Sequence, residues 1–238
     1  MVQQTVQHQM MGYDRASIVF SPDGRLLQTE YAKKAVRQGP PALGLVCKDG
    51  VLLVADKRVV EKLIIPKSIE KVYEVDEHIA ATATGFLMDA RVLLERAQLI
   101  AQQHKLSYDE PIDILTLVKE VCNLKQAYTQ YGGARPFGIS LLFGAVNDEP
   151  TLYVTDPAGI FLQYKATAIG EGETEIKEIL EKNYKESMTI DEGLKLAVSA
   201  LKKVLGKEFD LNRVDGAYIT TKEQKFKRLE KSQIKKSA

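Results

Sequence analysis

The order in which strand patterns and helix patterns alternate constrains the fold of this chain more than any single motif does. Residues 42–47 and 51–56 are apolar runs of strand length, separated by a turn that contains glycine, and this pattern predicts a β-hairpin. Residues 71–75 and 79–84, separated by Asp76, Glu77 and His78, predict a second hairpin. Strands are therefore expected to come in pairs before the first long helix of the body.

From residue 86 the spacing of apolar residues changes to that of a helix. The expected inner face of this helix consists of Phe86, Ala90, Leu93, Leu94, Ala97, Ile100 and Ala101. A second helix is expected to begin near Pro111, because proline is favoured in the first turn, and to end in the glycine-containing loop at residues 130–136.

Further strand patterns at residues 138–146, 151–155 and 160–165 lead into a second pair of helices. The later helix opens with Thr189 and Glu192 at the spacing of a capping box. Because strand hairpins and helix pairs alternate twice, two antiparallel sheets can pack face to face, with one helix pair covering the outer face of each. The predicted fold class is α+β, a four-layer α-β-β-α sandwich.

Length and composition are those of one ordinary domain. The chain has 238 residues, 45% apolar and 27% charged, with a formal net charge of +1, so nothing indicates nucleic acid or a membrane surface as a partner. The apolar runs are far shorter than a membrane span. Cys47 and Cys122 are expected to be buried thiols and no secretory signal is apparent, so a reducing, cytoplasmic location is expected. No cofactor is expected, and the histidines are too scattered to suggest a metal site.

A segment with its own structural signals precedes this body. Residues 1–12 lack periodicity and are expected to form a mobile tail ahead of a single domain at residues 13–238. A turn at Pro22 leads into a helix expected from about residue 25 to about residue 37, which Gly39 and the two prolines after it would end. The expected face of this helix consists of Leu27, Tyr31 and Ala35.

The stretch "YDRASIVFSPDGRLLQTEYAKKAV" at residues 13–36 closely resembles the N-terminal signature of proteasome α subunits. Later blocks resemble the same family in the expected order: "SIEKVYEVDEHIAA", "DARVL", "YTQYGGARPFGISLL", "DPAG" and "YKATAIG". The resemblance extends to about Tyr218 and is closest to the archaeal type, in which one polypeptide fills every α position. It implies a sandwich of the N-terminal nucleophile hydrolase type, in agreement with the order of the elements.

The resemblance implies a protein that is not itself an enzyme. Catalytic relatives expose Thr, Ser or Cys as the first residue of the first strand, and the free α-amine beside it serves as the base. Here that position falls at Pro40 or Pro41, which have no hydroxyl group. Asp56 and Lys71 match the acid and the lysine that support the nucleophile in active relatives, but they cannot act without it. The alternative is a self-processing N-terminal nucleophile amidohydrolase, which a trimmed N-terminus and amide hydrolysis by the pure chain would favour.

The resemblance also implies residues for gating, docking and the pore. The gate cluster comprises Tyr13, Asp14, Arg15, Pro22 and Tyr31, the activator-binding residues are Lys71, Gly39, Gly85 and Phe86, and the pore annulus comprises Tyr131, Gly132 and Gly133. In this interpretation the lysine pairs with the C-terminal carboxylate of an activator tail. A solvated lysine, a core tyrosine and a plain helix-ending loop remain the open alternatives.

The implied partners are further copies in a homo-heptameric ring, the proteasome β subunits, an ATPase activator of the proteasome-activating nucleotidase type, and unfolded protein in transit. The helix from about residue 25 to about residue 37 is expected to pack against its counterpart next door, or to cap its own sheet. Family members often have Val at the position of Thr29 and Leu at the position of Phe86. Phe86 is expected to narrow or reshape the docking pocket.

One competing motif is a partial dinucleotide fingerprint in "AIGEGETEI". Its third glycine is replaced by Glu175, and the neighbouring acidic residues would repel a pyrophosphate. Acidic residues suit the N-terminus of a helix, which is the preferred interpretation.

Overall fold

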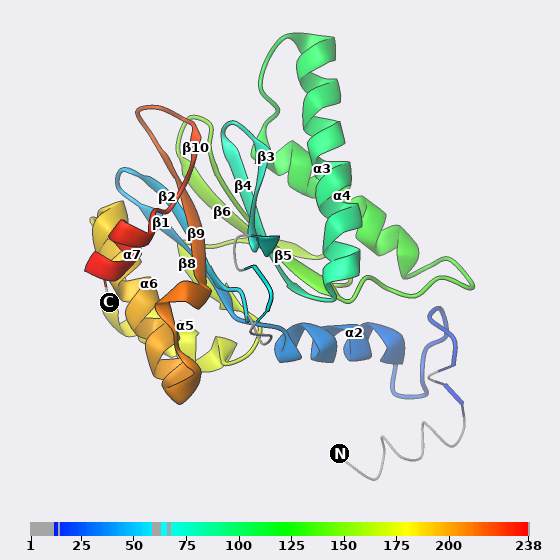
Figure 1. The fold of residues 1–238 in the computed structure, drawn as a ribbon. Helices are drawn as coiled ribbons and strands as arrows, with labels where there is room; N and C mark the ends of the chain where they lie inside the picture. Colours follow the sequence, from blue (N-terminus) through cyan, green and yellow to red (C-terminus); the bar gives the residue numbers. More distant parts are fainter. Residues whose placement is uncertain (1–11, 14, 59–62, 66–67, 238) are drawn as a thin grey trace.

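The computed structural model describes residues 12–13, 15–58, 63–65 and 68–237. In this part of the chain, two antiparallel five-stranded sheets lie face to face and helices cover both outer faces (Figure 1). The predicted α+β sandwich with four layers is therefore confirmed. The described helices include none long and apolar enough to cross a membrane.

The first sheet combines strands from distant parts of the chain. Its order is β10-β9-β2-β1-β8, with the bounds Phe226–Arg228, Val214–Thr220, Gly50–Asp56, Ala42–Cys47 and Ala166–Ile169. The first predicted hairpin is present: β1 and β2 pair from Ala42 with Ala55 to Cys47 with Gly50, across a two-residue turn.

The second sheet is continuous in sequence order. Its order is β3-β4-β5-β6-β7, with the bounds Val72–Asp76, Ile79–Gly85, Ile139–Val146, Pro150–Thr155 and Phe161–Gln163. The second predicted hairpin is β3 and β4. Strand β5 is buried along its whole length, because the other sheet covers one of its faces and helices cover the other.

The sequence did not indicate one crossing between the sheets. The strand expected at residues 160–165 ends at Gln163, and β8 follows it almost at once. Strand β8 does not extend the second sheet but pairs with β1 of the first, from Ala42 with Ile169 to Leu45 with Ala166. This pairing satisfies the backbone groups on the second side of β1, which the hairpin alone leaves open.

The helix pairs lie where the sandwich requires them. The second sheet is covered by α3 (Leu87–Tyr108) and α4 (Ile114–Tyr128), and the first by α5 (Glu173–Asn183) and α6 (Ile190–Leu205) (Figure 1). Shorter helical pieces are α7 (Lys231–Lys236) and 3-10 turns at Gly206–Glu208 and Leu211–Arg213.

Of the features expected at helix starts, the buried place of Phe86 and the first-turn place of Pro111 are wrong, and the capping box is confirmed. Phe86 does not belong to the buried stripe: it precedes α3, and its side chain is 46% exposed because its backbone is tied to Gly138 outside the helix. Pro111 lies outside α4, since the Asp113 carboxylate caps the helix by accepting the N–H of Thr116 at 3.0 Å. The capping box of Thr189 in α6 is present.

Helix α2 (Leu27–Gln38) lies across one end of the sandwich (Figure 1). It begins about two residues later than expected, and its buried residues are Leu27, Thr29, Ala32 and Val36. The face expected from the sequence is therefore rotated: Tyr31 and Ala35 are half-buried at its flank. Contacts of α2 with β4 and β5 show that it packs on the second sheet of its own chain.

The Thr29 hydroxyl is an exception to the hydrogen bonding of the core. Thr29 is 7% exposed, and among the described residues its Oγ1 is the buried side-chain polar atom without a hydrogen-bond partner. Burying a hydroxyl without a partner costs about 1–3 kcal/mol in proteins.

We expect Thr29→Val to raise the free energy of unfolding by about 1 kcal/mol, because valine keeps the shape and removes the unpaired hydroxyl. Thr174→Val, at an exposed position of α5, is the matched control and should change stability by less than about 0.5 kcal/mol. Urea unfolding of the three chains measures both. A destabilised Thr29→Val chain would contradict the interpretation.

Candidate functional site

The candidate site lies at the end of the sandwich where α2 passes into β1. Gly39 is buried there against the end of β4: a Cβ on Gly39 would lie 2.7 Å from the backbone nitrogen of Gly85 and 2.8 Å from Cγ2 of Thr84. The Thr84 hydroxyl also donates a hydrogen bond to the carbonyl oxygen of Pro40 at 2.9 Å. The end of α2 is therefore fixed to β4 through bare backbone, and no side chain fits at residue 39.

Gly85, the second small residue predicted for the pocket, is equally constrained. Its φ of +124° favours glycine, and a Cβ would lie 2.1 Å from the carbonyl oxygen of Gly138. The structure thus brings Gly39 and Gly85 into contact. Phe86 follows directly, with its ring against Gly138, where an added Cβ would be 2.4 Å from the ring.

The position that would hold a nucleophile contains no hydroxyl or thiol. Pro40 and Pro41 connect α2 to β1, and the Pro41 carbonyl accepts the N–H of Asp56 at 2.9 Å. Both proline nitrogens are tertiary amides within a continuous chain, so neither offers the free amine that an N-terminal nucleophile needs as its base.

Asp56 is committed to an ion pair. The carboxylate is 1% exposed and accepts two hydrogen bonds from the Arg213 guanidinium, at 2.9 Å from Nε and 2.6 Å from Nη2. The hydrogen bond to Asp56 raises the pKa of Arg213 above its already high value. A third bond comes from the backbone N–H of Arg58 at 3.1 Å. Such a fork neutralises the buried carboxylate, so it serves the structure at the end of β2.

Lys71 is buried next to this pair. Its side chain is 2% exposed, and Nζ donates to the carbonyl oxygen of Ala83 on β4 at 3.1 Å. Burial lowers the pKa of the Lys71 ammonium to about 8, although the Asp56 carboxylate acts in the opposite direction. An ammonium can donate three hydrogen bonds, and among the described residues only Ala83 accepts one from Nζ. Lys71 therefore reaches strand β4 two residues before Gly85, but the single chain encloses it, which differs from the solvated lysine that the sequence left open.

The residues predicted for the gate lie on separate segments ahead of β1. Pro22 is exposed in a turn closed by the Gly24 N–H donating to the Ser21 carbonyl at 2.8 Å. Tyr31 is half-buried on α2, with the Lys34 ammonium 5.3 Å from the centre of its ring. Tyr13 is half-buried and Arg15 exposed, while Asp14 lies outside the described residues.

The loop predicted for the pore annulus extends beyond α4. Its residues 131–135, which we call the annulus loop, follow the helix, and the Tyr131 side chain is 62% exposed. Gly133 has a φ of +84° with nothing within 4 Å of an added Cβ, so backbone conformation and not space favours glycine. The loop shares a cavity of about 340 Å³ with Gln28 and the N-terminal segment at residues 15–18.

A two-residue contact at this loop is the feature that sequence reasoning missed. Arg135 forms a fork with Asp89 of α3, with both Nη–Oδ distances at 2.7 Å. Both residues stand in blocks that carried the family resemblance, "DARVL" and "GGARP", but nothing in their spacing shows that they meet.

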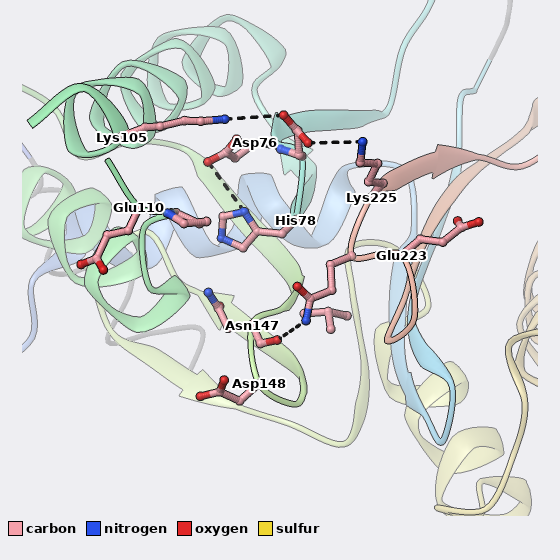
Figure 2. A pocket seen from close by; sticks show the side chains of 12 residues that line it. Asp76, His78, Lys105, Glu110, Asn147, Asp148, Glu223 and Lys225 are labelled. Carbon is pink, nitrogen blue, oxygen red and sulfur yellow. Dashed lines mark hydrogen bonds and ion pairs between the residues drawn. The ribbon is translucent and has the colours of Figure 1, made fainter. Parts of the chain in front are cut away.

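A separate cavity of about 430 Å³ lies at the opposite end of the sandwich (Figure 2). Its cations are already paired, because Glu77 lies 3.5 Å from the Lys105 ammonium and 3.9 Å from that of Lys225. The buried His78 ring contacts the Ile112 carbonyl at 2.9 Å. The described residues include no cluster of three or more His, Cys, Asp or Glu that could hold a metal ion. None of the predicted site residues lines this cavity.

The partial dinucleotide fingerprint has a structural explanation. Gly172 precedes α5 with φ +67°, and Glu173 in the first turn of the helix lies 3.9 Å from Arg37 and from Lys177. Glu171 forms an ion pair with Arg58. Acidic side chains therefore occupy the helix N-terminus that a pyrophosphate would need.

Comparison with known proteins gives consistent matches along the chain. Residues 13–35 match the family described as the N-terminal signature of A-type proteasome subunits, and residues 36–219 match the family described as "Proteasome subunit". The proteasome α subunit of Pyrococcus abyssi is 51% identical over 94% of this chain and 86% of its own length. Those of Methanocaldococcus jannaschii and Archaeoglobus fulgidus are 50% and 48% identical over 94% of this chain, covering 86% and 92% of their own lengths.

The lowered pKa of Lys71 predicts a pH dependence of stability. The unfolded chain keeps the proton up to about pH 10.4, the ordinary lysine pKa, whereas the folded chain releases it near pH 8. The unfolded state therefore binds more protons between these values, and the free energy of unfolding should rise with pH there. Lys71→Met should reduce this rise by up to about 3 kcal/mol, because each tenfold change in proton affinity corresponds to about 1.4 kcal/mol.

Urea unfolding of the wild-type and Lys71→Met chains across this pH range measures the difference. Part of the rise should remain in the variant, because burial lowers the pKa of Lys125 on α4 to about 8 as well. Lys48→Met, at an exposed lysine, should leave the wild-type slope unchanged. Equal slopes for wild type and Lys71→Met would contradict the buried, partly neutral lysine.

Proposed function

The chain belongs to the α subunits of the proteasome family, and from this premise we propose that copies of it form a heptameric ring that gates the passage of protein substrates. Family membership makes it a non-catalytic component of the proteasome core, whose α subunits assemble with catalytic β subunits. The ring would restrict access to the chamber that the β subunits enclose and would dock the C-terminal tails of an ATPase activator in ATP-dependent protein degradation.

The observation that carries the proposal is the position of the segment ahead of β1. Helix α2 covers the end of the sandwich at which catalytic relatives expose their nucleophile, and Gly39 fixes it there. Residues at that end contribute to backbone contacts and ion pairs, not to a reactive group. The position of α2 over this end of the sandwich supports the role of a gate and does not support a self-processing hydrolase.

We further propose that the leading segment switches between two arrangements. Tyr13, Asp14, Arg15, Pro22 and Tyr31 would form a contact between neighbouring subunits, with tyrosine hydroxyls as donors to the carboxylate and the backbone. An activator that shifts the exposed turn at Pro22 would favour this contact and hold the residues before it away from the pore. Without the activator these residues would occupy the pore and exclude protein substrates, above an annulus formed by Tyr131, Gly132 and Gly133.

The docking pocket, defined as Gly39, Lys71, Gly85 and Phe86, would receive the end of an activator tail. The two glycines let backbone pack on backbone with no side chain between, and the Lys71 ammonium has donors to spare. A terminal carboxylate is the acceptor that suits a buried cation. Phe86, exposed at the rim, would contribute apolar contact.

Removal of residues 2–12 should increase hydrolysis of large substrates by the assembled core particle about 10-fold or more, because it empties the pore without touching the chamber. Fluorogenic-peptide and casein hydrolysis, with native mass spectrometry of the same sample, measure this effect. The isolated α chain should give heptamers with an intact N-terminus and no hydrolysis. Equal casein hydrolysis with and without residues 2–12 would show that they do not gate.

Lys71→Ala should abolish the stimulation of hydrolysis by a synthetic peptide that carries the C-terminal sequence of the ATPase activator, while the ring still assembles. The same peptide with an amidated C-terminus should fail to stimulate the wild-type particle, since it lacks the carboxylate. Lys48→Ala, at an exposed lysine of the β1–β2 turn, is the matched control. Normal stimulation of the Lys71→Ala particle would refute the docking role.

A further inference from the structure

Phe86 of the docking pocket is held by two neighbours within its own chain. Its N–H donates to the Gly138 carbonyl at 2.9 Å, and its ring lies directly against the Gly138 backbone. On the same side, the Arg135 guanidinium lies 5.8 Å from the centre of the ring, within the range of a cation–π contact. A ligand that moves this ring must therefore also disturb Arg135.

Arg135 makes further hydrogen bonds besides this ring contact. Its guanidinium forms the fork with Asp89 and also donates to the Pro136 carbonyl at 3.1 Å. Asp89 is 6% exposed and accepts a further bond from the Gly138 N–H at 2.8 Å. Burial alone would raise the pKa of Asp89, but the hydrogen bond from Arg135 holds this pKa below its usual value. The pair thus joins a buried carboxylate to a guanidinium whose side chain is 51% exposed, in a bidentate geometry.

The chain changes from core to exposed loop at Arg135. After it, Pro136 and Phe137 are buried, and the Phe137 ring packs on Tyr128 of α4 with 4.6 Å between centroids. Before it, two backbone hydrogen bonds of 3.2 Å hold the annulus loop: the Tyr131 N–H donates to the Ala127 carbonyl, and the Ala134 N–H donates to the Tyr131 carbonyl. Residues 132–134 have few contacts of their own, so the direction of the loop depends on where Arg135 is anchored.

The annulus loop in turn borders the N-terminal segment. Residues 132–135 and residues 15–18 line one cavity, and a Cβ on Gly132 would lie 3.9 Å from Cδ1 of Ile18. A shift of the loop therefore changes the space available to the segment that leads to the gate tail.

From these contacts we infer that Arg135 is a positioning residue, which couples occupancy of the docking pocket at Phe86 to the annulus loop and to the N-terminal segment beside it. The inference rests on the gating function proposed above. Its physical basis is that one guanidinium holds the pocket ring, the Asp89 carboxylate and the end of the loop at once. If an activator tail binds more tightly when the Arg135 guanidinium is in one of two positions, it favours the gate arrangement that belongs to that position. The shift of the gate equilibrium equals the difference in binding free energy.

The test uses the assembled core particle with the Arg135→Gln substitution, which removes the charged fork. The synthetic activator-tail peptide should reach half-maximal stimulation within about 3-fold of its wild-type concentration, whereas the maximal stimulation should fall about 5-fold or more. Arg135→Lys, which keeps the charge but not the fork, should recover part of it. Arg91→Gln, at an exposed arginine of α3, is the matched control and should behave as wild type.

Two further measurements separate coupling from damage to the fold. In a particle that lacks residues 2–12, Arg135→Gln should have no effect on hydrolysis, since no gate remains to be positioned. Asp89→Asn keeps the side-chain shape, should assemble even where Arg135→Gln does not, and should also lower maximal stimulation. The variant with both Arg135→Gln and Asp89→Asn should lose no more maximal stimulation than the more impaired single variant, because both substitutions break the same ion pair.

Wild-type maximal stimulation in either Arg135→Gln or Asp89→Asn would overturn the coupling. So would a loss that persists in the particle without residues 2–12. These results differ from a failure of the proposed function, in which deletion of residues 2–12 does not raise hydrolysis or Lys71→Ala is stimulated normally.

Discussion

The structure depends on one place where backbone meets backbone without a side chain between. Gly39, Gly85 and Gly170 converge there from the end of α2, the end of β4 and the end of β8. An added Cβ on Gly170 would lie 2.8–2.9 Å from the carbonyl oxygens of Pro40 and Gly39. This contact joins both sheets to the leading helix, so a methyl group at any of the three positions would force them apart.

The same contact decides what chemistry the site can perform. Because α2 continues into Gly39 and two prolines, the first strand begins inside the chain and has no free amine. The acid and the lysine that would support a nucleophile are still close together, but Arg213 neutralises one and burial lowers the pKa of the other. A buried acid and a buried lysine therefore do not identify an enzyme, since structural ion pairs perturb the same groups.

The sequence predicted what depends on local periodicity and failed where partners are distant. Hairpins β1–β2 and β3–β4, and the capping box of α6, follow from short patterns. The pairing of β8 with β1 does not, because a four-residue strand has no signal that selects a sheet. Lys125 lies on the apolar face of α4 and is buried there, with Nζ donating to Ile139 and Thr155, and no charge pattern indicates that. The fork of Arg135 with Asp89 links residues 46 positions apart. Tertiary contacts of this kind override local propensity.

The crossing of the chain between the sheets also fixes the order in which a growing polypeptide can complete them. The second sheet, β3 to β7, has all its strands once Gln163 has left the ribosome. The first hairpin is made earlier, yet β1 waits for β8 and β2 waits for β9, which ends at Thr220. During that interval both outer edges of the oldest strands are unpaired and open to other chains. The strands synthesised first are thus the last to be paired on both edges, and the nascent chain is most vulnerable to mispairing at β1 and β2.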